Sequence, residues 1–555
     1  MSNNISNPTI LFETSWEVCN KVGGIYTVLS SKAKLLCRKF GNKVIFIGPD
    51  VWSDENPSPF FIESDSVLAD WTASLELPFN VKVRVGNWNI PGSPIAILVK
   101  FDSVYNHLNP IYSLMWEKFN VDSLHSYGDY SEGCAFAVAT AVVMKSLSDF
   151  ISKDDDKVVA HFNEWTTGMG LLYLKVHAPE ISTVFTTHAT SIGRSICGNG
   201  KPLYDYFKFY NGDQMAAELN MQSKHSLEKA AAHNADCFTT VSEITAKECK
   251  QLLEIEPLVT PNGFELTFVP DKRKYPSKRL SARKTLLKVA EALTGKHFDS
   301  DTFLYATAGR NEYRNKGLDL FVDSLNHLRQ KELSRSVIAF ILVPAWSNGY
   351  RQDLFQKLNG YTDSQLENPI ITHNLHDYSS DTIYNRLRYL GFNNAQFDKV
   401  NVIYVPCYLN GDDGIFNMTY YDLLVGFDAV EFASYYEPWG YTPHEGIAFG
   451  VPTITTDLAG FGQWILSEFG GGFMACGTEV IHRTDSNYDS AAEKIVECLE
   501  TLISADNKTA EEIHESALKT SKQASWGKFM KYYELAYKTA IKNNYKNQLA
   551  LPNLI

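Results

Sequence analysis

Positive charge is scarce along this chain of 555 residues. The sequence has 64 acidic and 51 basic residues, which gives a net charge of −13, and it has no long run of lysine or arginine. A protein that binds nucleic acid usually presents a basic face. The composition therefore argues against a nucleic-acid partner, and the cations that matter must be few and placed within a cleft.

Paired cysteines and long apolar segments are also lacking. The nine cysteines are scattered singly, with no C-x-x-C pair, so the sequence predicts neither a disulfide framework nor a zinc site. Single thiols suit the reducing cytosol. The first eight residues do not resemble a signal peptide, and no apolar run approaches the ~18 residues of a membrane span. We expect a soluble, cytoplasmic protein with no membrane partner.

The chain is too long for one hydrophobic core, since single cores stop growing near ~250–300 residues. Apolar strands alternate with helical segments, which predicts parallel sheets. The expected strands are residues 9–13, 42–48, 157–162, 182–187, 237–241 and 258–263, and then 302–310, 336–343, 401–405 and 450–456. We predict an α/β protein with two Rossmann-like, doubly wound domains that face each other across a cleft.

The predicted domain boundaries follow the change of pattern along the chain. The first domain should cover residues 1–270 and the second residues 271–525, with a helical insertion at about 348–399. Residues 526–555 read as a C-terminal helical segment that could pack back on the first domain. Ligands of such folds bind beyond the carboxyl ends of the strands, so we looked for polar residues at those positions.

A lysine and a glycine pair follow the first predicted strand. In the segment Lys21-Val22-Gly23-Gly24, the glycines would let the backbone approach a phosphate at a helix N-terminus, and Lys21 would add positive charge. Glycines at such turns are common, so a structural role is an equal alternative. The dinucleotide fingerprint G-x-G-x-x-G is absent here.

Two cations follow the first strand of the second domain. Arg310 and Lys316 lie between a predicted strand and a helix, where they could neutralise a diphosphate leaving group. A solvated loop charge is the usual role of a single arginine or lysine. The position after a strand favours function.

Further polar residues end strands of the first domain. His161 and Glu164 belong to one such end, and His188 and Arg194 to the next. His188 could hydrogen-bond a sugar hydroxyl. A lone histidine is more often a satisfied structural residue.

The segment Tyr436 to Glu445 is the most informative. Thr442-Pro443-His444-Glu445 has the form of a capping box with proline at the first helical position, so Glu445 could be a helix cap. Glu437 has no such explanation, because it precedes a Pro-Trp-Gly loop, where a buried carboxylate needs a cation or a sugar hydroxyl as its partner.

Together these residues resemble the eukaryotic-type glycogen synthase family, which are retaining glycosyltransferases of the GT-B fold. The similar segments span nearly the whole chain in the family's order. They are ETSWEVCNKVGGIYTV (13–28), HFNEW (161–165), TTHATSIGR (186–194), TPNGF (260–264), GRNEYRNKG (309–317), PIITHN (369–374) and SYYEPWGYTPHEGIAFGVPTITTDLAGFG (434–462).

The resemblance implies UDP-glucose as donor and the non-reducing end of an α-1,4-glucan, such as glycogen, as acceptor. The N-terminal domain would be the acceptor side and the C-terminal domain the nucleotide-sugar side. The implied UDP or UDP-glucose contacts are Lys21, Gly23, Gly24, His188, Arg194, Arg310, Lys316, Glu437, Trp439, Gly440, Thr442 and Glu445. Of these, Glu437, Lys316, Arg310 and His188 would be catalytic, and His161 and Glu164 would lie on the acceptor side.

The implied reaction retains the α configuration through an oxocarbenium-like state, and the departing diphosphate takes the acceptor's proton. Glu437 would stabilise charge rather than attack. We expect no cofactor and no metal, because arginine and lysine replace a divalent cation. The formal D-x-D of Asp154-Asp155-Asp156 reads as a solvated loop.

The sequence departs from the family's well-known eukaryotic members. Their arginine-rich helix, which binds glucose 6-phosphate, has no counterpart, because residues 491–555 contain no arginine. Their histidine-rich stretch after TPNG is also missing. We predict an enzyme that glucose 6-phosphate does not activate, an unregulated or bacterial member. The insertion is short beside the family's tetramer-forming insert, so a homo-oligomer stays an open possibility.

Two other classes of function remain as alternatives. Another GT-B enzyme could make sucrose or trehalose phosphate, and a phosphate-binding acceptor pocket would favour it. An inactive glucan-binding scaffold is the second alternative, which the intact set Lys21, Arg310, Lys316 and Glu437 argues against. Donor preference between UDP-glucose and ADP-glucose stays open.

Overall fold

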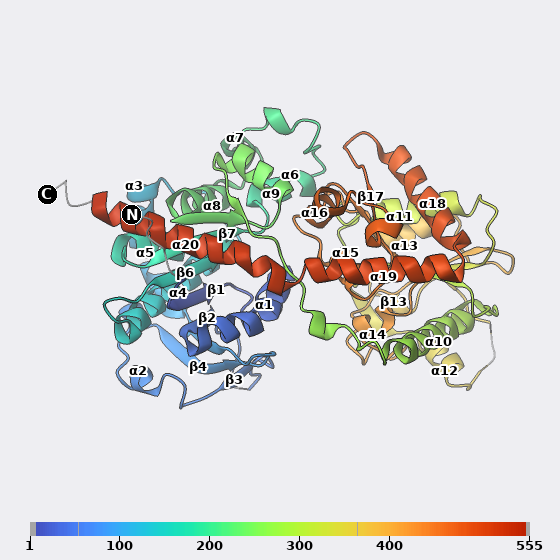
Figure 1. Ribbon diagram of the computed structural model, residues 1–555, viewed down its shortest axis with the longest axis horizontal. Helices are drawn as coiled ribbons and strands as arrows, with labels where there is room; N and C mark the ends of the chain where they lie inside the picture. Colours follow the sequence, from blue (N-terminus) through green and yellow to red (C-terminus); the bar gives the residue numbers. More distant parts are fainter. Residues whose placement is uncertain (1–6, 54, 363–364, 551–555) are drawn as a thin grey trace. The chain divides into compact units, whose positions relative to one another are not determined.

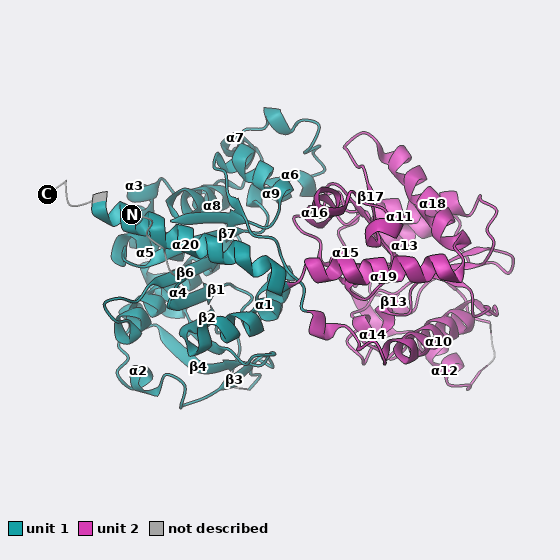
Figure 2. Cartoon of the chain, viewed as in Figure 1, with its two compact units in different colours: residues 1–265, 526–555 teal, residues 266–525 magenta. Residues whose placement is uncertain are grey.

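The computed structural model describes residues 7–53, 55–362 and 365–550. The chain divides into two compact units, one of residues 1–265 with 526–555 and the other of residues 266–525 (Figure 2). The boundary thus falls after Glu265 rather than at residue 270. Parts of the predicted N-terminal segment (1–6), insertion (363–364) and C-terminal segment (551–555) lie outside the described residues.

The first unit is built on one nine-stranded sheet with the order β3-β4-β5-β2-β1-β6-β7-β8-β9. Its strands are β1 (Ile10–Thr14), β2 (Val44–Pro49), β3 (Phe61–Glu63), β4 (Lys82–Trp88), β5 (Ile95–Lys100), β6 (Val158–Asn163), β7 (Ser182–Thr187), β8 (Cys237–Thr240) and β9 (Leu258–Val259). The predicted strands are present and pair in parallel. Sequence analysis did not identify the edge formed by β3, β4 and β5, in which β4 runs antiparallel to both neighbours.

Helices cover both faces of this sheet (Figure 1). They are α1 (Gly24–Phe40), α2 (Ala69–Ala73), α3 (Leu108–Phe119), α4 (Tyr130–Ile151), α5 (Trp165–His177), α6 (Ser191–Gly198), α7 (Gly212–Glu218), α8 (Gln222–Asn234), α9 (Glu243–Glu248) and α20 (Trp526–Ala550). Core strands such as β2 are buried at every residue, which is the pattern of a parallel sheet covered on both faces.

Helix α4 corrects one expectation. By length and composition it is the one helix of the described residues that could cross a membrane, with a mean hydropathy of 1.6 over 18 residues. The prediction that no segment approaches a membrane span was therefore wrong. Because 72% of that window is buried inside the structure, and α4 packs along α5, its apolarity is that of a core helix.

Helix α20 follows the whole of the second unit in the sequence, but it belongs to the first unit, where it lies against β7 and β8. Its first residue, Trp526, donates its indole N–H to the Ser31 hydroxyl over 2.8 Å. The backbone of Trp526 also passes so close to Gly263 that a Cβ there would lie 2.6 Å from the Trp526 nitrogen. The C-terminal helix is thus part of the core of unit 1.

The second unit has a six-stranded parallel sheet with the order β14-β11-β10-β15-β16-β17. Its strands are β10 (Phe303–Ala308), β11 (Val337–Leu342), β14 (Val400–Tyr404), β15 (Ala429–Phe432), β16 (Thr453–Thr456) and β17 (Thr478–Ile481). Its helices are α10 (Tyr275–Thr294), α11 (Leu318–Leu328), α12 (Gln352–Leu358), α13 (Thr382–Tyr389), α14 (Tyr420–Leu424), α15 (Tyr441–Ala448), α16 (Gly460–Phe469), α17 (Phe473–Cys476), α18 (Tyr488–Ser504) and α19 (Asn507–Gln523).

The predicted insertion at 348–399 is less helical than expected. Its described part contains helices α12 and α13, but it also contains most of an antiparallel ribbon made of β12 (Ser347–Tyr350) and β13 (His373–Leu375). Strand propensity in so short a segment is weak, so cross-strand pairing decided the local structure.

Candidate active site

Two of the four residues that sequence analysis predicted to be catalytic, Lys316 and Glu437, contact each other. The Lys316 ammonium lies 2.5 Å from the Glu437 carboxylate, with only 17% and 14% of the two side chains exposed. Lys316 follows β10 and Glu437 follows β15, and these strands are neighbours in the sheet. The carboxylate that needed a cation or a sugar therefore has a cation from its own unit.

Backbone contacts bring these two loops together. The N–H groups of Tyr435 and Tyr436 both donate to the Asn315 carbonyl, over 2.9 and 3.2 Å. Gly317 has φ +71°, and a Cβ at this residue would lie 2.1 Å from the Ala433 carbonyl oxygen. Glycine is therefore required at position 317, and its close approach sets Lys316 beside Glu437.

Arg310 lies apart from this pair. It follows β10 after Gly309, and 57% of its side chain is exposed. Its guanidinium contacts Glu312 over 2.7 Å. The side chain thus lies exposed at the carboxyl edge of the sheet, and its predicted contact with the diphosphate stays a prediction.

Helix α15 begins earlier than the predicted capping box implies. Its N-cap is Gly440, with φ +102°, its first residue is Tyr441, and no side chain in the described part of the chain caps it. The prediction that Thr442 caps this helix was wrong, because the glycine allows the chain to turn into the helix two residues sooner. The positive end of the helix dipole is consequently not neutralised by a carboxylate cap.

Glu445 is not a cap either. It lies inside α15 with 8% of its surface exposed, and its carboxylate accepts the hydroxyl of Tyr421 over 2.8 Å. Burial raises the pKa of Glu445 to about 7. The helix-cap alternative for Glu445 is thereby excluded, and its contact with the donor ribose stays a prediction.

Trp439 and Gly440 differ in whether they can contact a sugar. The Trp439 ring is 4% exposed and packs edge-on against Phe461 at 5.9 Å between ring centroids. The carbonyl of Trp439 accepts the Phe461 N–H over 2.7 Å. The indole is therefore part of the core, while Gly440 brings the backbone to the start of α15.

The Lys21-Val22-Gly23-Gly24 turn in the first unit already holds an anion. The Glu17 carboxylate accepts the N–H of Gly23 over 2.7 Å and that of Tyr26 over 2.9 Å. These are donors of the α1 N-terminus that a phosphate would use. The predicted phosphate role of Gly23 therefore conflicts with an internal glutamate. Gly24 has no atom within 4 Å of a Cβ position, and Lys21 remains exposed.

His188 is held inside the first unit. Its Nε2 lies 3.0 Å from the Asn163 amide oxygen, whose amide nitrogen in turn donates to the Thr14 carbonyl over 3.0 Å. Burial lowers the pKa of His188 to about 3, so the ring is neutral near pH 7. Because Nε2 faces the Asn163 amide oxygen, which can only accept, the proton of the neutral ring lies on Nε2 and Nδ1 is the acceptor.

His161 belongs to a buried network rather than to an open acceptor surface. Its Nδ1 lies 3.1 Å from Glu13, which also contacts Lys32 over 2.8 Å and accepts the Tyr537 hydroxyl over 2.9 Å. Burial by itself would raise the pKa of Glu13, but the charges of His161 and Lys32 hold it well below its usual range. The predicted acceptor role of His161 is therefore not supported by its position.

Glu164 adopts a backbone conformation that is unusual for a residue with a side chain, with φ +71°. Its carboxylate accepts the N–H groups of His188 and Ala189 over 3.0 and 3.2 Å. Burial raises its pKa to about 7, against the lowering effect of the Arg194 charge. Strained backbone in this position is often found at functional sites, and Arg194 itself is exposed on α6.

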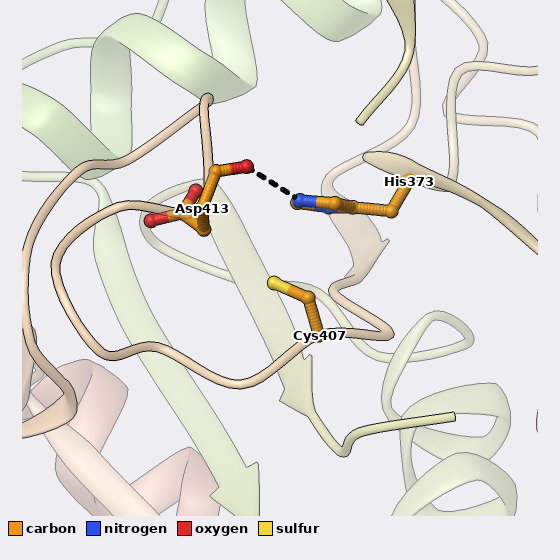
Figure 3. A group of neighbouring side chains, drawn as sticks. All are labelled: His373, Cys407 and Asp413. Carbon is orange, nitrogen blue, oxygen red and sulfur yellow. Dashed lines mark hydrogen bonds between the residues drawn. The ribbon is translucent and has the colours of Figure 1, made fainter. Parts of the chain in front are cut away.

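A histidine, a cysteine and an aspartate in the second unit approach one another, but each is used by the fold. Ligand atoms of His373, Cys407 and Asp413 lie within 4.8 Å of one another. His373 Nε2 points to the Asp413 backbone carbonyl, 3.1 Å away (Figure 3). The Asp413 carboxylate accepts backbone N–H groups of residues 415, 416 and 417. Burial raises the pKa of Cys407 to about 12. These contacts explain why the three residues lie close together, since they belong to a hydrogen-bonded turn.

Solved structures of similar fold are glycosyltransferases. The catalytic domain of starch synthase IV from Arabidopsis thaliana, bound to ADP and acarbose, superimposes with a TM-score of 0.58 at 13% identity, covering 97% of this chain and 100% of that one. An α,α-trehalose 6-phosphate synthase from Burkholderia multivorans gives a TM-score of 0.54 at 11% identity, covering 97% and 98%. The two units together therefore define a GT-B glycosyltransferase fold.

Sequence comparison specifies the family. The sequence profile of glycogen synthase matches residues 13–359 and 354–553. The liver glycogen [starch] synthase of Rattus norvegicus is 30% identical over 550 residues, covering 88% of this chain and 77% of that protein. Glycogen [starch] synthase isoform 1 of Saccharomyces cerevisiae is 31% identical over 540 residues, covering 82% and 75%. The chain belongs to the glycogen synthase family.

Proposed function

We propose that this protein is a glycogen synthase, which transfers glucose from UDP-glucose to the non-reducing end of an α-1,4-glucan and retains the α configuration. The observation that carries the proposal is the contact between Lys316 and Glu437, which joins two motifs of the family at the carboxyl edge of one sheet. A scaffold without catalysis would not need a largely buried cation beside that carboxylate.

The second unit supplies the groups that the donor requires. Lys316 and Arg310 carry positive charge for the diphosphate, and the uncapped N-terminus of α15 adds backbone N–H donors. Glu437 stabilises the positive charge that develops on the glucose ring. We infer that Thr442 and Glu445, on the same helix, contact the nucleoside.

The contacts of the carboxylates favour a reaction without an enzyme-bound glucose. Retaining glycosidases use two carboxyl groups about 5 Å apart, one of them as nucleophile. Here Glu437 is ion-paired with Lys316, and Glu445 accepts a hydrogen bond from Tyr421. We infer that the acceptor hydroxyl attacks the face from which the diphosphate leaves. Its proton passes to the departing diphosphate oxygen as the new glycosidic bond forms.

Three finer points are also proposals. Glucose 6-phosphate does not activate the enzyme, because residues 491–555 contain no arginine to bind its phosphate. The protein acts in the cytoplasm, which suits nine cysteines that are all free thiols. It functions without a membrane or nucleic-acid partner, and a homo-oligomer, if one forms, does not use a long helical insert.

A coupled assay of UDP release tests the proposal. Glycogen as acceptor should support turnover with UDP-glucose, and the same enzyme should be assayed with ADP-glucose. Adding glucose 6-phosphate at fixed UDP-glucose should leave the rate within about twofold, since a coupling of 1–3 kcal/mol would change it ~5–150-fold. Turnover with glucose 6-phosphate or fructose 6-phosphate as acceptor, and none with glycogen, would instead support a disaccharide-phosphate synthase.

A further inference from the structure

The loop that follows β7 has an unusual arrangement of hydrogen bonds. It runs from His188 to Ser191, between the strand and helix α6, and the backbone N–H of each of its four residues donates to a carboxylate. Successive free N–H groups at the start of a helix normally bind water or an anionic ligand. In this protein they are occupied by glutamates.

Three glutamates from three different elements hold the loop. Glu164, at the start of α5, accepts His188 N and Ala189 N over 3.0 and 3.2 Å. Glu248, the last residue of α9, accepts Thr190 N and the Thr190 hydroxyl over 3.2 and 2.5 Å. Glu228, in α8, accepts Ser191 N over 2.8 Å, the Ser191 hydroxyl over 2.7 Å and the Thr187 hydroxyl over 3.1 Å. We name Glu164, Glu228 and Glu248 the carboxylate clamp.

The sequence of the loop leaves room for the clamp. A Cβ on Gly193 would lie 2.3 Å from the Glu248 Oε1 atom and 2.7 Å from the Thr190 hydroxyl oxygen. Gly193 has an ordinary backbone conformation. Glycine is therefore needed at this position because there is no room for a side chain, and not because of its φ angle. The glycine and the carboxylate are therefore matched to one another.

Burying carboxyl groups is costly in either protonation state unless they are hydrogen-bonded, so their presence here needs a reason. Glu228 is fully buried and Glu248 is 3% exposed. Burial, together with the charge of Glu164, raises the pKa of Glu228 to about 8. If the loop only had to connect a strand to a helix, neutral side-chain caps such as Thr190 could satisfy its backbone N–H groups. The arrangement instead fixes the four residues from three different elements.

We propose that Glu228 and Glu248 are positioning residues of glucosyl transfer, which together with Glu164 hold the loop 188–191 so that His188, its first residue, and Arg194, three residues beyond its last, keep the places that the reaction requires. This inference rests on the proposed function. It also explains why the α6 N-terminus does not hold the donor's phosphates, since its donors are already used. The diphosphate is left to the cations and the uncapped helix of the second unit.

The test substitutes Glu228 by Gln. Glutamine replaces one of the two carboxyl oxygens by an NH₂ group, which cannot accept the hydrogen bonds that Thr187 or Ser191 donates to that oxygen. The loop should shift by a fraction of an ångström. We expect kcat with UDP-glucose and glycogen to fall about tenfold to hundredfold, since such misplacements cost up to ~10²-fold, while KM for UDP-glucose changes less than about threefold.

Asp236, which directly precedes β8, provides a control at the opposite end of β7. Its carboxylate accepts the Thr183 N–H over 2.8 Å and the Thr183 hydroxyl over 3.0 Å, at the amino end of β7, and it also pairs with Lys175 over 2.6 Å. Asp236→Asn places an NH₂ group against the Thr183 donors and removes this ion pair, away from the loop 188–191. It should lower the thermal unfolding temperature at least as much as Glu228→Gln and leave kcat within about twofold.

The outcomes separate the two proposals. If the unsubstituted protein transfers no glucose from UDP-glucose, the proposed function fails and the positioning role fails with it. If it does transfer glucose and Glu228→Gln keeps full kcat, or Asp236→Asn loses as much, only the positioning role is overturned. Should Glu228→Gln not fold, Ser191→Ala removes one hydroxyl contact alone and should lower kcat several-fold. An unchanged kcat in that variant would equally refute the clamp.

Discussion

The Lys316 ammonium lies 2.5 Å from the Glu437 carboxylate, although the two residues are 121 positions apart in the sequence. Each is the other's counter-ion, and neither is more than one-fifth exposed. A diphosphate that approaches Lys316 must compete with Glu437 for it. If Lys316 binds the donor as proposed, we expect donor binding to release the carboxylate toward the glucose ring.

Removing that carboxylate should stop turnover without unfolding the protein. We expect Glu437→Ala to lower kcat by orders of magnitude, because a charge-stabilising group at a reacting centre contributes about 10²–10³-fold or more. Glu437→Gln should be nearly as slow, since the amide keeps the shape and loses the charge. The assay is UDP release with glycogen, alongside circular dichroism to verify folding.

Glu497→Gln is the control for this series. Glu497 pairs with Lys494 over 2.9 Å on an exposed face of α18, so its loss should change neither rate nor stability measurably. An unchanged rate in Glu437→Ala would remove the central role of this residue.

The close packing of Gly317 against Ala433 should be as necessary for activity as the Lys316–Glu437 pair that it positions. In Gly317→Ala the new Cβ would face the Ala433 carbonyl at 2.1 Å, in addition to the strain of φ +71°. We expect the free energy of unfolding to fall by more than ~2 kcal/mol and kcat to fall as well, because Lys316 moves with the loop.

Gly295→Ala separates the two contributions. Gly295 has the same φ of +71°, but nothing lies within 4 Å of its Cβ position, so only the conformational cost of ~1 kcal/mol remains. Urea denaturation of both variants measures the difference. Equal losses of stability would show that the contact with Ala433 relaxes freely.

The contribution of Glu431 to the stability of this protein should fall as the pH rises from about 5 to 8. Glu431 is fully buried on β15 and accepts the hydroxyl of Tyr305, and burial raises its pKa from 4.5 to about 8. Between these values the folded protein keeps a proton that the unfolded chain has lost. The free energy of unfolding therefore decreases by ~1.4 kcal/mol per pH unit for each such carboxyl.

Glu431→Gln tests this relation, because glutamine cannot lose a proton. Urea denaturation at pH 5, 6, 7 and 8 should show that the free energy of unfolding of the unsubstituted protein, minus that of the variant, decreases as the pH rises. Glu228 and Glu445, whose pKa values burial raises to about 8 and 7, should account for part of the remaining slope. Parallel curves would mean that Glu431 is ionised in the folded state at these pH values.

The C-terminal helix should stabilise the first unit through one hydroxyl group. Tyr537→Phe removes the donor that reaches Glu13 over 2.9 Å and leaves that buried carboxylate with fewer partners, at a cost of about 1–3 kcal/mol. Thermal unfolding measures the loss. Tyr545→Phe, at a ring that is 58% exposed on the same helix, should change nothing. A Tyr537→Phe variant as stable as the control would mean that water replaces the hydroxyl.

Local sequence patterns determined much of this fold. The apolar segments at 182–187 and 336–343 became β7 and β11, because a strand buried on both faces must be apolar along its length. The family motifs also identified Lys316 and Glu437 as residues of one site. Strands whose burial is one-sided, such as β4, left a weaker pattern and were missed.

Only the tertiary structure decided which groups satisfy one another. Glu17 occupies the N–H groups of Gly23 and Tyr26, and Gly440 rather than Thr442 begins α15. A nearby acidic residue preceding a glycine turn could have suggested the first of these. Nothing in the sequence identifies Glu228 or Glu248 as partners of the loop 188–191, because those residues are separated from it by tens of positions and meet it only through packing of α8 and α9. Spacing along a chain determines helices and strands, whereas hydrogen bonds between distant side chains depend on the order of strands in a sheet and on the helices that cover it.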